Sequence, residues 1–323
     1  MLEINSANCR QWSRMGSRAV FGQAILDLAA TKHNLMVLSA DLGNSSGLGR
    51  FKNKYPEKFL NVGIAEQNMI GIASGLAKED FVVFATSFAP FISMRSSEQI
   101  RMNLGYMNLN VKAVAIGSGI SMAFLGNSHY GIEDVSVMRS IPNLTVVTPA
   151  DCAEVVKTVY AAAEFDGPMY IRLTGAMNNP VVYKEDYNFE IGKAIVITEG
   201  QDITIFANGS MVYESLEAAK ILNEHSISAA VVNMHTVKPL DTSVIDTALR
   251  SSKLIVTVEE HSVIGGLGSA IAEYKTAFNN ASPQVIIGLP DCFLKAGDYR
   301  YMLEEYGLTS SRIAQKILKH YVS

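Results

Sequence analysis

The sequence predicts an α/β protein built from two doubly wound domains. Short β-branched runs alternate with longer helical patterns, which is typical of βαβ units around a parallel sheet covered on both faces. The alternation lapses once, near the middle of the chain, and 323 residues are enough for two domains of average size. We therefore expect domains over residues 1–178 and 191–323, joined by a linker over 179–190.

The first half predicts a complete alternating series. Apolar periodicity and the positions of Gly, Pro and Asn set the limits of its elements. We expect one helix opening at Glu66, further helices over 18–30, 91–104, 132–139 and 151–165, and strands over 36–40, 81–85, 111–116, 144–147 and 169–173. Loops rich in Gly and Ser follow two of these strands, at 43–47 and 117–131, in the positions where α/β sheets place ligands.

The second half begins after a stretch of polar and aromatic residues that follows Asn178 and ends the first series. We expect strands over 203–207, 229–233, 254–258 and 285–287, and helices over 211–224, 241–250, 265–278 and 310–321. The turn at 265–268 lacks the third glycine of a dinucleotide-binding loop, so it favours close packing of a helix on its strand.

Composition excludes several classes of protein. A net charge of −4 with 18% charged residues gives no surface for nucleic acid. The three cysteines, Cys9, Cys152 and Cys292, have no spacing typical of a zinc site or a disulfide framework. No apolar run is long enough for a membrane span, and the start lacks the pattern of a signal peptide. We expect a cytoplasmic protein that binds neither nucleic acid nor membrane.

A carboxylate at a predicted helix start is the first candidate functional group. Glu66 follows the apolar approach 59–65 and opens a small-residue helix, in which Gly71 and Gly75 share one face and would allow close packing. An acidic residue there offsets the helix dipole by about 0.3–1 kcal/mol. A buried carboxylate is also a candidate acid–base group, and this stretch alone is compatible with either role.

A histidine and an aromatic stripe are the next candidates. His129 stands in the loop at 117–131, and a hydrogen-bonded structural role is the commoner one for a single histidine. Phe88, Phe91 and Met94 follow a strand end along one face of a turn or helix start, where core packing is the commoner role. Beside a loop histidine and a carboxylate, such residues would also suit a flat heteroaromatic ligand.

Several motifs together resemble one family. The first half is similar to the pyrimidine-binding domain of transketolases through NVGIAEQN (61–68), FATSFAPF (84–91), GNSH (126–129), IPN (141–143) and TPAD (148–151). The second half is similar to the transketolase C-terminal domain through ANGS (207–210), VNMHTVKPL (232–240) and VEEH (258–261). The resemblance covers nearly the whole chain, in order.

The resemblance implies thiamine diphosphate as cofactor. In that family a glutamate at the position of Glu66 hydrogen-bonds the aminopyrimidine ring and promotes the imino tautomer that removes the thiazolium proton. The family pattern places Phe88 and Phe91 against the pyrimidine, with Met94 one turn further on. His129 would hydrogen-bond an oxygen of the donor or intermediate. Ile64 would lie at the cofactor site, and Asp41 would lie near the cofactor at the subunit contact.

The resemblance also implies a partner chain. Transketolases grip the diphosphate and Mg²⁺ with a Gly-Asp-Gly signature and a downstream Asn in a preceding domain, and the chain contains no Gly-Asp-Gly. We therefore expect no metal ligands in this chain, an N-terminal subunit that carries the diphosphate- and magnesium-binding domain, and a dimer of heterodimers. This chain would be the C-terminal subunit of a split transketolase, inactive alone.

The substrate pattern departs from the family. Arg18 and Ser45 match transketolase positions that contact an acceptor phosphate, and together they would form an anion clamp. Gly117 and Gly175 replace a phosphate-contacting histidine and a second arginine, and Leu125 replaces an aspartate that reads an acceptor hydroxyl. We expect transfer of a two-carbon ketol unit between a sugar or sugar-phosphate donor and a specialised aldehyde acceptor.

Three alternatives remain open at this point. The run at 64–67 is shared with 1-deoxyxylulose-5-phosphate synthase, and the two-domain layout is shared with beta subunits of 2-oxoacid dehydrogenases. Phe88 and Phe91 favour transketolase over both. A non-catalytic regulatory paralogue is an alternative of another class, and Glu66 and His129 argue against it.

Overall fold

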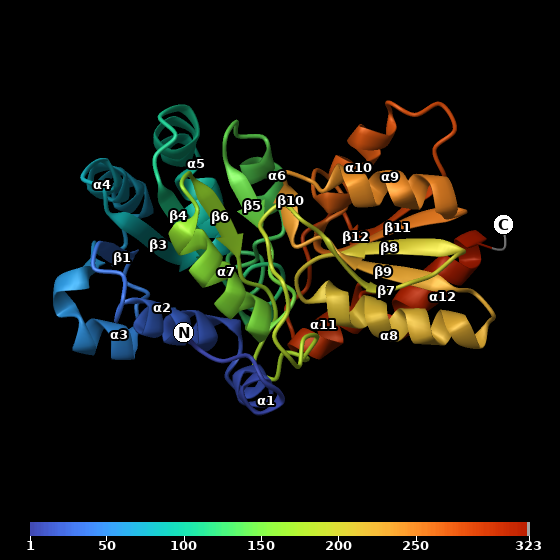
Figure 1. Ribbon diagram of the computed structural model, residues 1–323, viewed down its shortest axis with the longest axis horizontal. Coiled ribbons are helices and arrows are strands. Elements are labelled where there is room, and N and C mark those ends of the chain that lie inside the picture. Colours follow the sequence, from blue (N-terminus) through green and yellow to red (C-terminus); the bar gives the residue numbers. More distant parts are fainter. Residues whose placement is uncertain (322–323) are drawn as a thin grey trace.

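Each half of the chain winds its helices around one sheet, as the computed structural model of residues 1–321 shows (Figure 1). The first sheet has seven strands in the order β10-β5-β6-β4-β3-β1-β2, and the second has five in the order β12-β11-β8-β9-β7. The expectation of two doubly wound α/β units is confirmed.

The strands of the first sheet are β1 (Leu35–Ser39), β2 (Phe59–Asn61), β3 (Val82–Phe88), β4 (Val111–Ile116), β5 (Thr145–Val147), β6 (Met169–Arg172) and β10 (Thr236–Lys238). Those of the second are β7 (Ile195–Thr198), β8 (Ile203–Ala207), β9 (Ala229–Asn233), β11 (Leu254–Ser262) and β12 (Gln284–Leu289). Neighbouring strands are parallel except at one edge of each sheet, where β10 pairs antiparallel with β5 and β7 with β9. The predicted parallel pairing is therefore found in the body of each sheet, and one edge strand of each sheet runs antiparallel.

The α-helices and short helical turns, in chain order, are α1 (Ser6–Met15), α2 (Ser17–Leu28), α3 (Gly49–Lys54), η1 (Pro56–Lys58), α4 (Glu66–Lys78), η2 (Phe91–Arg95), α5 (Ser97–Gln99), η3 (Ile100–Tyr106), η4 (Ala123–Leu125), α6 (Asp134–Arg139), α7 (Cys152–Glu164), α8 (Met211–Glu224), α9 (Thr242–Ser251), α10 (Leu267–Lys275), α11 (Tyr299–Glu305) and α12 (Ser310–Tyr321). The helix expected over 91–104 is divided into π-helical turns, η2 and η3, around the short α5.

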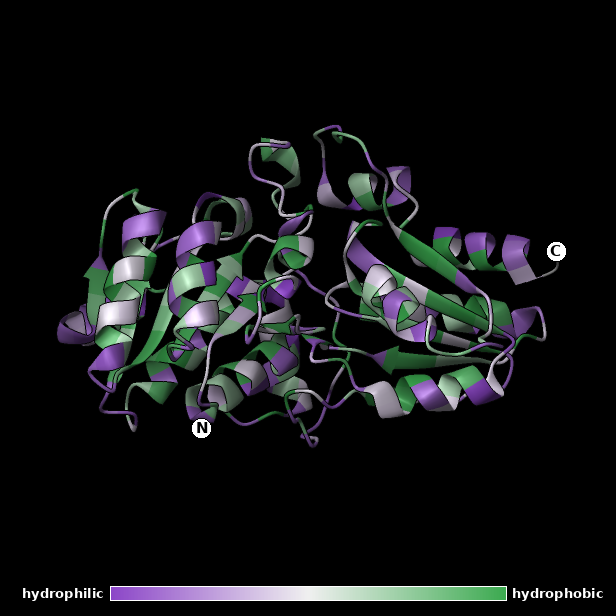
Figure 2. Ribbon diagram, turned by 90° about the horizontal axis from the view of Figure 1, so that it is seen from above, coloured by the Kyte–Doolittle hydropathy of each residue, from purple (hydrophilic) through white to green (hydrophobic). Residues whose placement is uncertain are grey.

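Alternating residues of the central strands supply the two faces of each core. In β3, Phe84 packs with the cluster under α2 and α7, and Ala85 packs with the cluster under α4. In β8, Ile205 faces α8 and α12, and Phe206 faces α9 and α10. Figure 2 shows hydrophobic strands between helices with hydrophilic outer surfaces. No helix within residues 1–321 is long and apolar enough to cross a membrane.

The two halves are joined by more than the expected linker. β10 comes from the second half and completes the edge of the first sheet. Ile120, Ala123 and Tyr130 come from the loop at 117–131 of the first half and belong to a core cluster of the second. The segment at 179–190 is irregular, and it packs through Val182 and Tyr183, whose amides both donate to Asp151 Oδ2.

Candidate functional site

Glu66 is a buried carboxylate at the start of α4, with 2% of its surface exposed. Ser87 Oγ, at the end of β3, donates to Oε1 at 3.0 Å, and Arg95 Nη1, at the end of η2, donates to Oε2 at 2.7 Å. Both oxygens are thus held by side chains from other elements. This arrangement goes beyond compensation of the helix dipole.

Phe88, Phe91 and His129 form an aromatic group close to that carboxylate. The ring centroids of Phe88 and Phe91 are 6.1 Å apart, and His129 lies 5.6 Å from Phe88 and 5.4 Å from Phe91, all edge to face. Arg95 links the group to Glu66, because its guanidinium carbon also lies 4.3 Å from the centre of the Phe91 ring. His129 Nδ1 lies 3.0 Å from Ser128 Oγ.

Three of the residues expected at the cofactor lie on the surface. Ile64, two residues before Glu66, is 77% exposed, and Met94, in η2, is 50% exposed. Asp41 follows β1 with φ +57° and makes its hydrogen bonds with Asn61, at the end of β2. In the single chain the structure therefore brings together Glu66, Phe88, Phe91 and His129, and leaves Ile64, Met94 and Asp41 facing outward.

Arg18 lines a cavity of about 140 Å³ near the expected substrate residues. Ser121, Met122, Phe124 and Met177 contribute to the same lining. Within the described residues the hydrogen-bond partner of Arg18 is the Ser45 carbonyl, at the long distance of 3.5 Å. Burial lowers the pKa of the Arg18 guanidinium. The cavity thus offers one cation beside an apolar wall.

Ser45 and Leu125 are placed differently from the expectation. The contact of Ser45 with Arg18 is through its backbone carbonyl, so the structure does not place its hydroxyl in an anion clamp. Leu125 ends the turn η4, is 39% exposed, and follows directly after Phe124 of the cavity lining.

Sequence reasoning missed Arg95 and Ser87, although weak signals exist for both. Ser87 directly precedes Phe88 on β3, and Arg95 stands four residues after Phe91, a spacing at which helical side chains meet. Residues 1–321 contain no group of three or more His, Cys, Asp and Glu side chains that could hold a metal ion.

The geometry gives a candidate acid–base site, in which a buried carboxylate lies close to two phenylalanine rings and an imidazole. Two family models match the chain in the same order: the transketolase pyrimidine-binding domain over residues 13–178 and the transketolase C-terminal domain over 192–313. The chain belongs to the transketolase family.

Known proteins similar to the chain agree with this family. A putative transketolase C-terminal section of Methanocaldococcus jannaschii is 41% identical over 94% of this chain and 96% of its own length. The 6-deoxy-6-sulfo-D-fructose transketolase subunit SqwH of Clostridium sp. is 39% identical over 92% of this chain and 92% of its own length. A 1-deoxy-D-xylulose-5-phosphate synthase of Dictyoglomus turgidum is 35% identical over 93% of this chain, which spans 48% of that enzyme.

Among solved structures, one described as a split gene transketolase, inactive beta4 tetramer, superposes with a TM-score of 0.84 at 40% identity. The match covers 95% of this chain and 98% of that one. The transketolase family implies thiamine diphosphate as the cofactor.

Proposed function

We propose that the chain is the C-terminal subunit of a split, thiamine-diphosphate-dependent transketolase. The observation that carries the proposal is the buried Glu66 carboxylate beside Phe88, Phe91 and His129. A relative named as a C-terminal section, another named as a subunit, and a match to a split gene transketolase support assignment to one subunit of a pair.

The residues present fit the pyrimidine ring of the cofactor. Arg95 is a flat group that donates an N–H to Glu66 and covers the Phe91 ring, so a planar nitrogen-containing partner that displaces Arg95 would contact both groups. Glu66 would share a proton with a ring nitrogen, and the two phenylalanines would hold the ring. When bound, thiamine diphosphate supplies the nucleophile and the electron sink. His129 would exchange a proton with an oxygen of the donor sugar.

A partner chain is the second part of the proposal. We assign the diphosphate and Mg²⁺ to an N-terminal subunit, and propose that the two chains assemble as a dimer of heterodimers. Exposed apolar residues lie on elements around Glu66 and support a contact surface there: Leu60, Ile64, Met94, Met102, Tyr106 and Met107. Gly71 and Gly75 of α4, the helix that begins at Glu66, are also exposed, and a Cβ on either would meet no atom within 4 Å.

The acceptor is the third part. We propose a specialised acceptor aldehyde with one anionic group and fewer hydroxyls than a pentose phosphate, because the cavity pairs Arg18 with Met122 and Phe124. The relative named for a sulfonated sugar supports a family branch with unusual substrates. Replacing Arg18 with Gln should raise KM for anionic acceptors by about tenfold, as expected for loss of a charged hydrogen bond.

Reconstitution tests the proposal. The purified chain should show no ketol transfer with thiamine diphosphate and Mg²⁺ alone, and should become active after co-expression with an N-terminal transketolase subunit. Turnover by the chain alone would refute the split-subunit assignment. Ordinary efficiency with xylulose 5-phosphate and ribose 5-phosphate would refute the specialised acceptor.

A second candidate is supported by the similarity to 1-deoxy-D-xylulose-5-phosphate synthase. The same reconstituted pair distinguishes it, because formation of 1-deoxy-D-xylulose 5-phosphate without ketol transfer would favour that activity. A pair that binds the cofactor and catalyses neither reaction would favour the non-catalytic paralogue.

A further inference from the structure

Glu260 lies at the junction of the two halves with its carboxylate fully engaged. It belongs to β11 and has 1% of its surface exposed. Its side chain accepts hydrogen bonds from the Ile120 amide and the Tyr299 hydroxyl, each at 2.7 Å, and from Ser210 Oγ. The bond to Ile120 crosses from the second half of the chain to the first.

Ile120 lies at the base of the loop that carries His129. Gly119 and Gly131 exchange two backbone hydrogen bonds, of 2.8 and 3.0 Å, which close this loop. Gly119 has φ +65°, and a Cβ there would lie 2.3 Å from Glu260 Oε1. The carboxylate is thus packed directly against the base of the loop, and a side chain at 119 would displace it.

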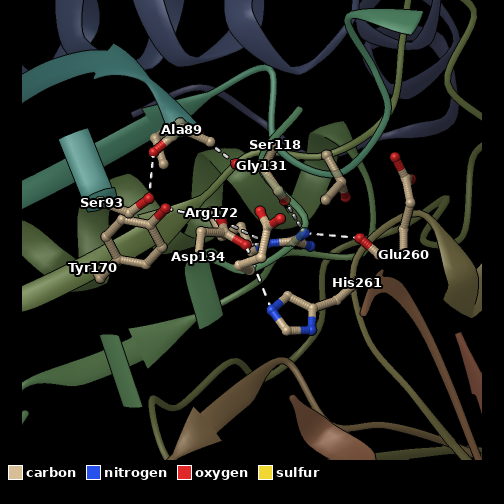
Figure 3. A network of polar contacts seen from close by, with 12 residues as sticks. Ala89, Ser93, Ser118, Gly131, Asp134, Tyr170, Arg172, Glu260 and His261 are labelled. Atoms are coloured by element: carbon tan, nitrogen blue, oxygen red, sulfur yellow. Dashed lines mark hydrogen bonds and ion pairs between the residues drawn. The ribbon is translucent and has the colours of Figure 1, made fainter. Parts of the chain in front are cut away.

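Arg172 connects Gly131, on the other side of the loop base, with Glu260. Its Nη2 donates to the Gly131 carbonyl at 2.9 Å and to the Glu260 carbonyl at 2.8 Å, as Figure 3 shows. Asp134 orients the guanidinium through two bonds of 2.9 Å to Nε. Both strands of the loop base are therefore fixed to Glu260, one through its side chain and one through its backbone.

The second half also holds the far side of the loop. Asn127 and Leu294 exchange side-chain and backbone hydrogen bonds of 2.6 and 2.8 Å, and the Tyr130 hydroxyl donates to the Lys295 carbonyl at 2.8 Å. His129 lies between Asn127 and Tyr130 and faces Phe88 and Phe91.

We propose that Glu260 is a positioning residue, which fixes the base of the loop over residues 119–131 and so holds His129 against Phe88 and Phe91. The inference rests on the proposed function, because it gives the second half of the chain a role in that reaction. Glu260 acts through the loop and touches neither the aromatic group nor the proposed cofactor site.

The neighbouring Glu259 provides a matched control. It is equally buried on β11, but its carboxylate accepts the Leu267 and Gly268 amides, at 2.7 and 2.9 Å, at the start of α10. Glu260→Asp keeps the charge and shortens the reach to Ile120, whereas Glu260→Gln keeps the reach and an acceptor oxygen. Glu259→Asp makes the same shortening away from the loop.

In the reconstituted pair, Glu260→Asp should lower kcat by about 10- to 100-fold, the effect of displacing a reacting group by roughly 1 Å. KM for the donor and the affinity for thiamine diphosphate should stay within about twofold of the wild type, because Glu260 touches neither ligand in the proposed site and its replacement leaves their binding contacts in place. Glu260→Gln should recover most of kcat, and Glu259→Asp should leave it near the wild-type value. Equal losses in Glu260→Asp and Glu259→Asp, or a loss in Glu260→Gln as large as in Glu260→Asp, would overturn the proposal.

Hydrogen–deuterium exchange of the chain alone tests the same claim without activity. Glu260→Asp should raise exchange in residues 119–131, and Glu259→Asp should raise it in residues 265–275. Tyr299→Phe, which removes one hydroxyl, is a milder variant and should raise exchange in the same loop to a smaller extent. Unchanged exchange in the loop would contradict the positioning role of Glu260. This result does not depend on activity, so it can be distinguished from failure of the proposed function, which an inactive wild-type pair would show.

Discussion

Glu66 has both carboxylate oxygens occupied in the single chain, by Ser87 and Arg95. The contact with Arg95 is the informative one, because the same guanidinium lies over Phe91. A pyrimidine bound to Glu66 and Phe91 would have to displace it. Arg95 is half exposed, which leaves it room to move.

Replacing Arg95 with Ala should therefore tighten the binding of thiamine diphosphate to the reconstituted pair. A partly exposed ion pair stabilises by about 1 kcal/mol, so the dissociation constant should fall about fivefold. Titration with fluorescence or circular dichroism would measure it. Arg101→Ala is the control, since Arg101 belongs to the same stretch but pairs with the exposed Glu98. Weaker binding by Arg95→Ala would identify Arg95 as a ligand of the cofactor instead.

Individual site residues could be predicted from the sequence where local pattern and resemblance coincided. Glu66, Phe88, Phe91 and His129 stand in quoted motifs, and the structure places them together. Arg95 was missed because its carboxylate partner, Glu66, lies 29 residues away in the sequence. Glu260 was missed because its partner Ile120 lies 140 residues away in the sequence.

At the scale of elements, α4 presents an open glycine face. Gly71→Leu should leave the fold intact, because nothing lies within 4 Å of the added Cβ and leucine favours helix over glycine by about 0.8 kcal/mol. Assembly with the partner subunit should weaken at least about tenfold, since close helix packing needs small residues there. Light scattering would report assembly and thermal melting would report the fold.

The control for this variant is Lys220→Leu, on the exposed face of α8. It adds a similar apolar side chain far from α4. Normal assembly of Gly71→Leu would show that the glycine face lies outside the interface.

His235 makes the junction near β10 sensitive to acid. It is fully buried against Phe189 at 4.5 Å, and burial lowers its pKa from 6.5 to about 4. As the pH falls below 6.5, His235 of the unfolded chain becomes protonated, whereas His235 of the folded chain stays neutral until about pH 4. This residue therefore makes the free energy of unfolding fall as pH drops through that window.

The slope from one such group is at most about 1.4 kcal/mol per pH unit. Denaturant unfolding measures the free energy of unfolding between pH 7 and 4. This free energy should fall less steeply with decreasing pH in His235→Gln than in the wild type, and the two slopes should differ by at most about 1.4 kcal/mol per pH unit. His33→Gln, at an exposed position, should follow the wild type. Identical slopes in all three proteins would contradict the buried neutral state of His235.

Most elements were predictable, and the exceptions have physical reasons. The central strands β3 and β8 are buried along their whole length, and their sequences, VVFATSF and ITIFA, are mostly apolar. β10 was missed because three residues next to a proline carry little periodicity. β11 was expected to end at Val258, but it continues to Ser262 because the other half of the chain supplies partners for its buried polar residues.

At the scale of the whole molecule, the two halves depend on each other. The domain limits of 1–178 and 191–323 stay a prediction, since β10 crosses into the first sheet and the loop over 119–131 packs into the core of the second half. The second half therefore supports the proposed site, although Glu66, Phe88, Phe91 and His129 all come from the first. Contacts of this kind depend on tertiary folding, so the sequence could not reveal them.

In the proposed function, Glu66 activates thiamine diphosphate in a site completed by a second chain. The most direct test is single-turnover ketol transfer by the reconstituted pair carrying Glu66→Gln, with cofactor binding measured in parallel. Glu79→Gln, at the exposed end of the same helix, is the control. Glu66→Gln should retain the fold and lose about 10²- to 10⁴-fold in rate, as for removal of a general acid–base group. A Glu66→Gln pair that turns over as fast as the Glu79→Gln pair would contradict the role of Glu66 in activating the cofactor.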